Sequence, residues 1–292
     1  MIWSHNNTLS PSQGDRFLFW ALSVFAGMAG AIVLLIVIFL VIETLPVLRH
    51  VGLGPFFFDS SWHPAEGLYN LLPMLWGTLL ATIGAVILAT FLGISSAVFC
   101  QYYAPPLLAL IYRKFIELLA GIPSVVFGLW GLMVLVPLIA SFRPPGPSLL
   151  AGIVILTLMI LPTIALTSEA SLAHVHREYI QGAVALGLRR WAIIRHVTFP
   201  TAKSGLFTGI VLQTGRAIGE TMAILMVCGN VVQTPSSVFD PIRTLTANIA
   251  LEMAYAVGNH RSALFLSGFL LLTTVMGLMF IAERIQRYSP NG

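Results

Sequence analysis

The chain has 292 residues, of which 57% are hydrophobic and only 9% are charged, whereas an ordinary soluble domain carries roughly 25% charged residues. The formal net charge is +4, but the basic residues flank apolar runs instead of gathering with aromatic residues on one face, which argues against nucleic-acid binding. Apolar runs of about 20 residues match the length that a helix needs to cross a hydrocarbon layer. The composition therefore argues against a soluble domain and predicts an all-α integral membrane protein.

About six apolar stretches are predicted to cross the membrane. The first, residues 17–42, is longer than the ~7–15 apolar residues of a signal peptide and has no small-residue cleavage site, so we expect it to be retained. The segment 43–70 is rich in proline and charge and is predicted to be an extramembrane loop. Part of 245–255, within a second outer loop, can form a short helix that rests on the outer surface. The remaining spans are expected at 71–99, 115–140, 149–167, 205–232 and 262–282.

Six spans place both termini on one side of the membrane, and the basic residues indicate which side it is. Cytoplasmic loops carry an excess of Lys and Arg, and the segments that share a side with the termini hold most of these residues. We therefore expect both termini to be cytoplasmic: a segment at 1–16, one transmembrane domain at 17–285 with its core at about 71–285, and a tail at 286–292. The inner basic residues are then Arg16, Arg113, Lys114, Arg177, Arg189, Arg190, Arg195, Lys203, Arg284 and Arg287, and the outer ones are Arg49, Arg143, Arg243 and Arg261.

The most charged segment of the chain, 168–204, lies on the inner side in this topology. Apolar and basic residues alternate along it with helical spacing, and Gly187 interrupts the pattern. A pair of amphipathic cytoplasmic helices fits this pattern, with Gly187 as a hinge in the left-handed conformation. An interfacial basic helix that lies on anionic lipid fits it equally well.

Two opposite charges lie inside the predicted span 205–232. Arg216 falls roughly 16 Å along this span, near the midplane of a ~30 Å hydrocarbon core. Glu220 is expected one helical turn further on the same face. A charge inside the membrane costs at least ~2.5–3.5 kcal/mol and needs a partner or a water-lined cavity. The two residues are therefore a candidate substrate pathway, and the alternative is a structural ion pair.

A stretch inside the charged segment resembles a known motif. Residues 181–200 read Gln-Gly-Ala-Val-Ala-Leu-Gly-Leu-Arg-Arg-Trp-Ala-Ile-Ile-Arg-His-Val-Thr-Phe-Pro. They are similar to the EAA loop of ABC importer permeases, in which Glu-Ala-Ala is followed by a spaced Gly and by Ile-x-Leu-Pro. Gln181 stands in place of the Glu and Gly182 in place of the first Ala. The resemblance implies a coupling helix that docks on a cytoplasmic ATPase, formed by Gln181, Gly182, Ala183, Gly187, Val197 and Pro200.

Further motifs resemble the permeases of the phosphate-specific transport (Pst) system. Arg-Ala-Ile-Gly-Glu-Thr at 216–221 and Gly-Ile-Pro-Ser-Val-Val-Phe-Gly-Leu-Trp-Gly at 121–131 carry this likeness. Arg-Thr-Leu-Thr-Ala-Asn-Ile-Ala-Leu-Glu-Met at 243–253 and the region 57–77 are similar to the PstC-type subunit more than to its PstA-type partner. The likeness extends over about 55–285.

This resemblance implies an ABC type I importer permease fold in a multi-pass protein of the bacterial cytoplasmic membrane. It implies partners as well: a PstA-type second permease, two cytoplasmic ATPase subunits, an external phosphate-binding protein and membrane lipid. The expected function is passage of inorganic phosphate, with Arg216 and Glu220 in the pathway. The alternatives are a permease of the same superfamily for another oxyanion, such as sulfate or molybdate, and an ATP-independent secondary transporter or channel.

Catalysis by this chain is not expected. The sequence has no Gly-rich phosphate loop that ends in Lys-Ser or Lys-Thr, so ATP and Mg are assigned to the partner ATPase and no cofactor to this chain. His174 and His176 lie near Glu169 and Glu178 in the sequence. A metal site needs three or four convergent ligands, which this grouping does not supply, so no metal site is predicted.

Overall fold

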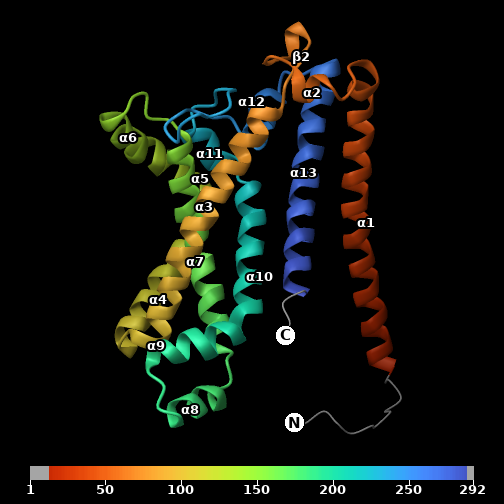
Figure 1. The fold of residues 1–292 in the computed structure, drawn as a ribbon. Helices are drawn as coiled ribbons and strands as arrows, with labels where there is room; N and C mark the ends of the chain where they lie inside the picture. The colour runs from red at the N-terminus through yellow and green to blue at the C-terminus, as the bar shows by residue number, and fades with distance from the viewer. Residues whose placement is uncertain (1–12, 288–292) are drawn as a thin grey trace.

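The computed structural model describes residues 13–287, and these form a helical protein with one small β-hairpin (Figure 1). The ends of the predicted terminal segments, 1–12 and 288–292, lie outside the described residues. The α-helices are α1 (Gln13–His50), α2 (Pro55–Phe58), α3 (Leu72–Val98), α4 (Pro106–Ala120), α5 (Ser124–Trp130), α6 (Val136–Phe142), α7 (Leu149–Ala173), α8 (Arg177–Ala185), α9 (Arg190–Ile193), α10 (Phe199–Ile218), α11 (Met222–Val227), α12 (Leu245–Glu252) and α13 (Gly258–Arg287). Strands β1 (Trp62–His63) and β2 (Leu68–Tyr69) pair antiparallel, and a 3-10 helix (Pro64–Glu66) connects them. Short π-helical segments occupy Phe99–Tyr103, Gly131–Leu135 and Ile194–Thr198.

Within residues 13–287, five helices are long and apolar enough to cross a membrane. This result confirms the prediction of an all-α, multi-pass membrane protein. The stretch expected as a further span, 205–232, is divided, because α10 ends at Ile218 and α11 is a separate short helix. The candidate spans are Gly14–His50, Leu72–Tyr103, Ser124–Phe142, Leu149–Ala173 and Gly258–Arg284.

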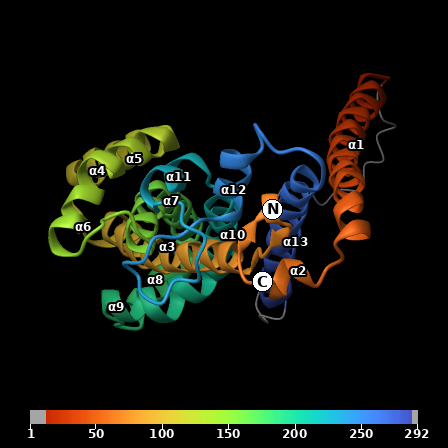
Figure 2. The same ribbon diagram turned by 90° about the horizontal axis from the view of Figure 1, so that it is seen from above.

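The start of α1, the end of α13 and the helices α8 and α9 lie toward one end of the molecule (Figure 1). Helices α2 and α12 and the hairpin lie toward the opposite end. Seen from above, α1 and α13 stand to one side of α3, α7 and α10, and α4, α5 and α6 stand to the other (Figure 2). The predicted grouping of the termini with 168–204 agrees with this arrangement, and the membrane side of each end stays a prediction.

Two span boundaries differ from those expected. The predicted span 115–140 includes a break, since α4 ends at Ala120 and α5 begins at Ser124. Pro123 causes this break, because its ring disfavours the helical conformation in Ile122 before it. The first helix also extends beyond its predicted end, through Pro46 to His50. Proline is tolerated inside membrane helices where neighbouring groups satisfy the freed carbonyls.

The main core lies where α3 packs against α7. The face of α3 that meets α7 carries a small residue every fourth position, as Ala81, Ala85, Ala89 and Gly93. A Cβ atom at Gly93 would lie 2.8 Å from Cγ2 of Ile164 on α7, so the two backbones approach closely. Apolar helices gain little from leaving lipid for one another, and close packing of this kind holds them together.

Candidate functional site

The first candidate site is the break between α10 and α11. Arg216 lies in the last turn of α10, and the helix ends two residues later. The Oε1 atom of Glu220 accepts a hydrogen bond of 3.1 Å from the backbone N–H of Ala223 and so satisfies a free donor in the first turn of α11. The hydroxyl of Thr246 on α12 donates to the backbone oxygen of Glu220 at 3.0 Å. Glu220 is therefore fixed by α11 and α12.

Arg216 and Glu220 do not form the geometry expected from helical spacing. The helix ends between them, so they do not share one face of a continuous helix. Arg216 is exposed and forms no ion pair or hydrogen bond with any side chain described between residues 14 and 284. Glu220 is half-buried. The guanidinium is therefore available to a ligand, and the carboxylate holds the break.

The polar groups at the break lie between the two ends of the molecule. Figure 1 shows that α10 ends about half-way up, beside the middle part of α13. Gln213, one turn before Arg216, is 4% exposed. Its Oε1 atom has no donor among the described residues. The end of α10 thus carries a buried amide and an exposed cation about half-way between the two ends of the molecule.

The second candidate site is the α8–α9 segment. Gly187 has φ +75°, as predicted for a hinge. The N–H of Gly187 donates to Val184 at 2.9 Å and the N–H of Leu188 donates to Ala183 at 3.1 Å, which is the Schellman pattern of a helix that ends on a left-handed glycine. The structure therefore has the predicted helix pair.

Most of the predicted coupling residues gather around one cavity of about 550 Å³. Leu186, the residue directly after α8, has 83% of its surface exposed, also lines the cavity and presents apolar surface outward. Gln181 and Gly187 are exposed beside the cavity but do not line it. The predicted coupling residues in the lining are Gly182, Ala183, Val197 and Pro200.

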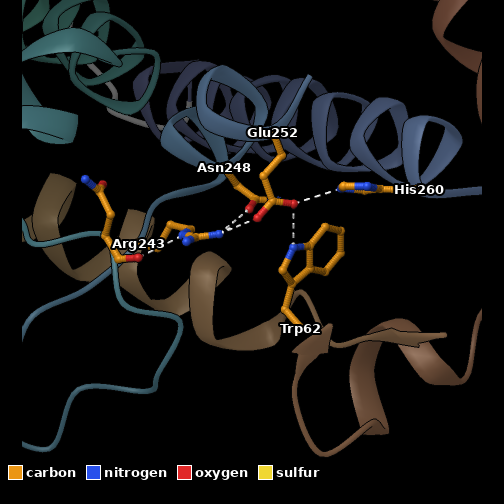
Figure 3. A network of polar contacts seen from close by, with 6 residues as sticks. Trp62, Arg243, Asn248, Glu252 and His260 are labelled. Carbon is orange, nitrogen blue, oxygen red and sulfur yellow. Dashed lines mark hydrogen bonds and ion pairs between the residues drawn. The ribbon is translucent and has the colours of Figure 1, made fainter. Parts of the chain in front are cut away.

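Two charged groupings were not predicted from the sequence. Glu252 of α12 accepts from Trp62, Arg243 and His260 at the end of the molecule that carries the hairpin (Figure 3). Arg113 of α4 pairs with Glu169 of α7 near the opposite end. Trp62 and Glu252, like Arg113 and Glu169, are far apart in the sequence, and Arg243 and His260 lie closer to Glu252. None of these pairs has the spacing of neighbours on one helix or strand, so the sequence did not indicate the contacts.

Comparison with known proteins identifies the class. Residues 89–290 match the family described as binding-protein-dependent transport system inner membrane component. The chain belongs to this family and is a multi-pass inner-membrane protein.

Individual relatives are more specific. The chain is 40% identical over 254 residues to the probable ABC transporter permease protein YqgH of Bacillus subtilis, with 84% of this chain and 82% of that protein covered. It is 33% identical over 261 residues to the phosphate transport system permease protein PstC of Xylella fastidiosa, with 81% of each covered. It is 31% identical over 284 residues to PstC of Haemophilus influenzae, with 90% of each covered.

A solved structure supports the fold. A chain of the inward-facing MetNI methionine ABC transporter aligns with a TM-score of 0.63 and 22% identity, with 79% of this chain and 100% of that chain covered. The fold is therefore that of an ABC type I importer permease, as predicted.

Proposed function

We propose that this chain is the PstC-type permease subunit of an ATP-driven importer of inorganic phosphate. The single observation that carries the proposal is the extended similarity to PstC proteins, which reaches 90% of the chain. The motif Arg-Ala-Ile-Gly-Glu-Thr at 216–221 adds to it, because it places a cation at the helix break. The role is passage of the substrate, and the chain itself performs no catalysis.

Arg216 is the proposed phosphate contact in the pathway. An anion meets a large barrier in an apolar passage, and a guanidinium lowers it by charge and by paired hydrogen bonds to phosphate oxygens. The available guanidinium of Arg216 suits this role, since none of the side chains described in 14–284 pairs with it. The Glu220 carboxylate nearby in the chain opposes tight binding of an anion, and conduction needs a site weak enough to release its ion.

The α8–α9 segment is the proposed contact with the ATPase. Exposed apolar side chains and a cavity at one end of a membrane protein suit a docked protein surface. In this scheme two cytoplasmic ATPase subunits bind ATP and Mg, a PstA-type permease completes the passage, and an external phosphate-binding protein delivers the substrate. ATP shifts the equilibrium between outward and inward access through its different affinity for the two states. This chain binds no cofactor in the scheme.

Uptake of radiolabelled phosphate tests the function. The chain is produced with its genomic neighbours in a bacterial strain that lacks its own phosphate importers. We expect uptake that unlabelled phosphate suppresses, that excess sulfate or molybdate leaves intact, and that is lost when the ATP-binding Lys of the ATPase partner is replaced. Suppression by sulfate or molybdate would identify another oxyanion permease. Uptake that survives the ATPase variant would identify an ATP-independent transporter.

A further inference from the structure

A buried carboxylate ties together four segments at the end of the molecule that carries the hairpin. Glu252 accepts hydrogen bonds from Nε1 of Trp62 at 2.9 Å, from Nη1 of Arg243 at 2.6 Å and from Nε2 of His260 at 2.8 Å (Figure 3). These residues come from β1, the loop before α12, α12 itself and α13. The side chain of Glu252 is 10% exposed, and those of Arg243 and His260 are each 18% exposed. The carboxylate is therefore the common acceptor of the cluster.

Helix α12 extends from this cluster to the break between α10 and α11. Glu252 is its last residue, and Thr246 lies in its first turn. Thr246 donates to the backbone oxygen of Glu220 at 3.0 Å. At 1.5 Å per residue, the two contacts lie roughly 9 Å apart along the helix. The cluster thus lies at one end of helix α12, and the break between α10 and α11 lies at the other.

A second connection runs from the cluster to the other end of α11. Nε of Arg243 donates to the backbone oxygen of Asn230 at 2.9 Å. The side chain of Asn230 donates in turn to the backbone oxygen of Leu225 on α11 at 2.7 Å. Helix α11 is therefore linked to Glu252 indirectly at both ends, through Arg243 and Asn230 at one end and through α12, Thr246 and Glu220 at the other.

We propose that Glu252 is a positioning residue for transport, and that it acts by holding α12 and Arg243 so that Glu220 and α11 keep their place at the break. The proposal rests on the proposed transport function. Burial of an ion pair is weak evidence for stability, because desolvation of both charges offsets their attraction. The cluster fixes one arrangement of four segments, which fits a role in positioning these segments better than a role in overall stability.

A double-mutant cycle tests the proposal. Glu252→Gln loosens the cluster, and Thr246→Val removes the hydroxyl that bonds Glu220 while keeping the shape of the side chain. Uptake per membrane-inserted complex is measured at several phosphate concentrations in the assembled importer. We expect Thr246→Val to lower the maximal rate about fivefold, as loss of one hydrogen bond of about 1 kcal/mol would. We expect a loss of about tenfold for Glu252→Gln, since several contacts change.

The double variant distinguishes positioning from local support. If Glu252 acts through the contact of Thr246, the double variant is no slower than Glu252→Gln within about twofold. If the maximal rate of the double variant falls by the product of the two single fold-changes, the proposal is overturned. It is also overturned if the variants change the KM alone. Absence of phosphate uptake by the unsubstituted complex would instead contradict the proposed function, so the two failures are separable.

Two further variants secure the comparison. Glu252→Gln leaves Arg243 without its carboxylate and can reduce insertion. In that case Trp62→Phe, which removes one donor to Glu252, takes its place in the same cycle with the same criterion. Ser236→Ala is the matched control, because among the described residues its hydroxyl bonds only Asp240, in an exposed loop. The fold-changes in maximal rate caused by Ser236→Ala and by Thr246→Val should multiply in their double variant. If they do not, the cycle does not report a specific coupling between Glu252 and Thr246, and the proposal is overturned.

Discussion

Arg113 holds Glu169 with two nitrogen atoms, Nε at 3.1 and 3.2 Å from the two carboxylate oxygens and Nη2 in a further contact with Oε1. The hydrogen bond and the charge of Glu169 raise the pKa of Arg113 above its usual value. The pair joins α4 to α7 shortly before α7 gives way to α8. It therefore ties α4 to the C-terminal part of α7, close to the start of the proposed coupling segment.

Replacement of Arg113 is expected to destabilise this end of the protein. Arg113→Gln leaves the largely buried carboxylate of Glu169 without its cation. We expect the free energy of unfolding to fall by about 1–3 kcal/mol. Thermal unfolding in detergent measures it as a lower Tm. Lys114→Gln is the matched control, because the Lys114–Glu117 pair is exposed and exposed pairs contribute little. Equal effects of the two variants would contradict the assigned role of the Arg113–Glu169 pair.

Gly187→Val is expected to abolish uptake while the protein still inserts. A β-branched residue resists the φ of +75° at this position, so the turn between α8 and α9 changes and association with the ATPase weakens. Uptake and co-purification of the ATPase check this. Gly52→Val is the control, since Gly52 has φ +82° and equally open surroundings near the end of α1. Normal uptake by Gly187→Val would remove Gly187 from the coupling surface.

Arg216→Gln is expected to abolish phosphate uptake while the complex still assembles and hydrolyses ATP. Arg216→Lys should keep part of the activity, because the charge stays but the planar fork is lost. Arg284→Gln, which removes an exposed cation stacked on Phe280 near the end of α13, is the control. Uptake and ATP hydrolysis are measured together. Full uptake by Arg216→Gln would exclude Arg216 from the pathway.

Glu220→Gln is expected to change transport without loss of the helix break. The amide oxygen of Gln still accepts from Ala223, but the negative charge is gone, so phosphate is either retained longer or leaks. A variant in which Arg216 and Glu220 exchange places should not regain phosphate uptake, since no contact joins the two side chains in the described structure. Restoration by the exchange would favour the structural ion pair.

The topology is tested by reporters of membrane side. Fusions at residue 1 and at residue 292 should report the cytoplasm, and a fusion near Ser60, between α2 and β1, should report the outside. The expectation rests on the distribution of basic residues. A C-terminal reporter active outside the cytoplasm, together with an N-terminal reporter active inside it, would show that the number of crossings is odd.

The sequence predicted those features that depend on local patterns. The apolar runs predicted the helical spans, Gly187 predicted the hinge, and the short helix expected within 245–255 is α12, although most of it is buried instead of resting on a surface. The pairing of Arg216 with Glu220 followed from helical spacing alone and did not anticipate that the helix ends between them. Whether a carboxylate pairs with a cation or accepts from a nearby N–H depends on the tertiary surroundings. The Glu252 cluster was unpredictable for the same reason, since Trp62 and Glu252 are 190 residues apart in the sequence.

Helix α1 packs chiefly against α13, through contacts such as that of Phe39 with Phe265, and the apolar stretch of 18 residues that defines its span has no buried residue. A side chain that faces lipid must be apolar but need not fit a particular shape. Along most of α1, exchange among Leu, Ile, Val and Phe should therefore be neutral, whereas Ala81 or Gly93 on α3 should accept no larger residue. Tolerance to substitution should thus fall steeply from the first helix to the α3–α7 contact, even though both are strongly apolar.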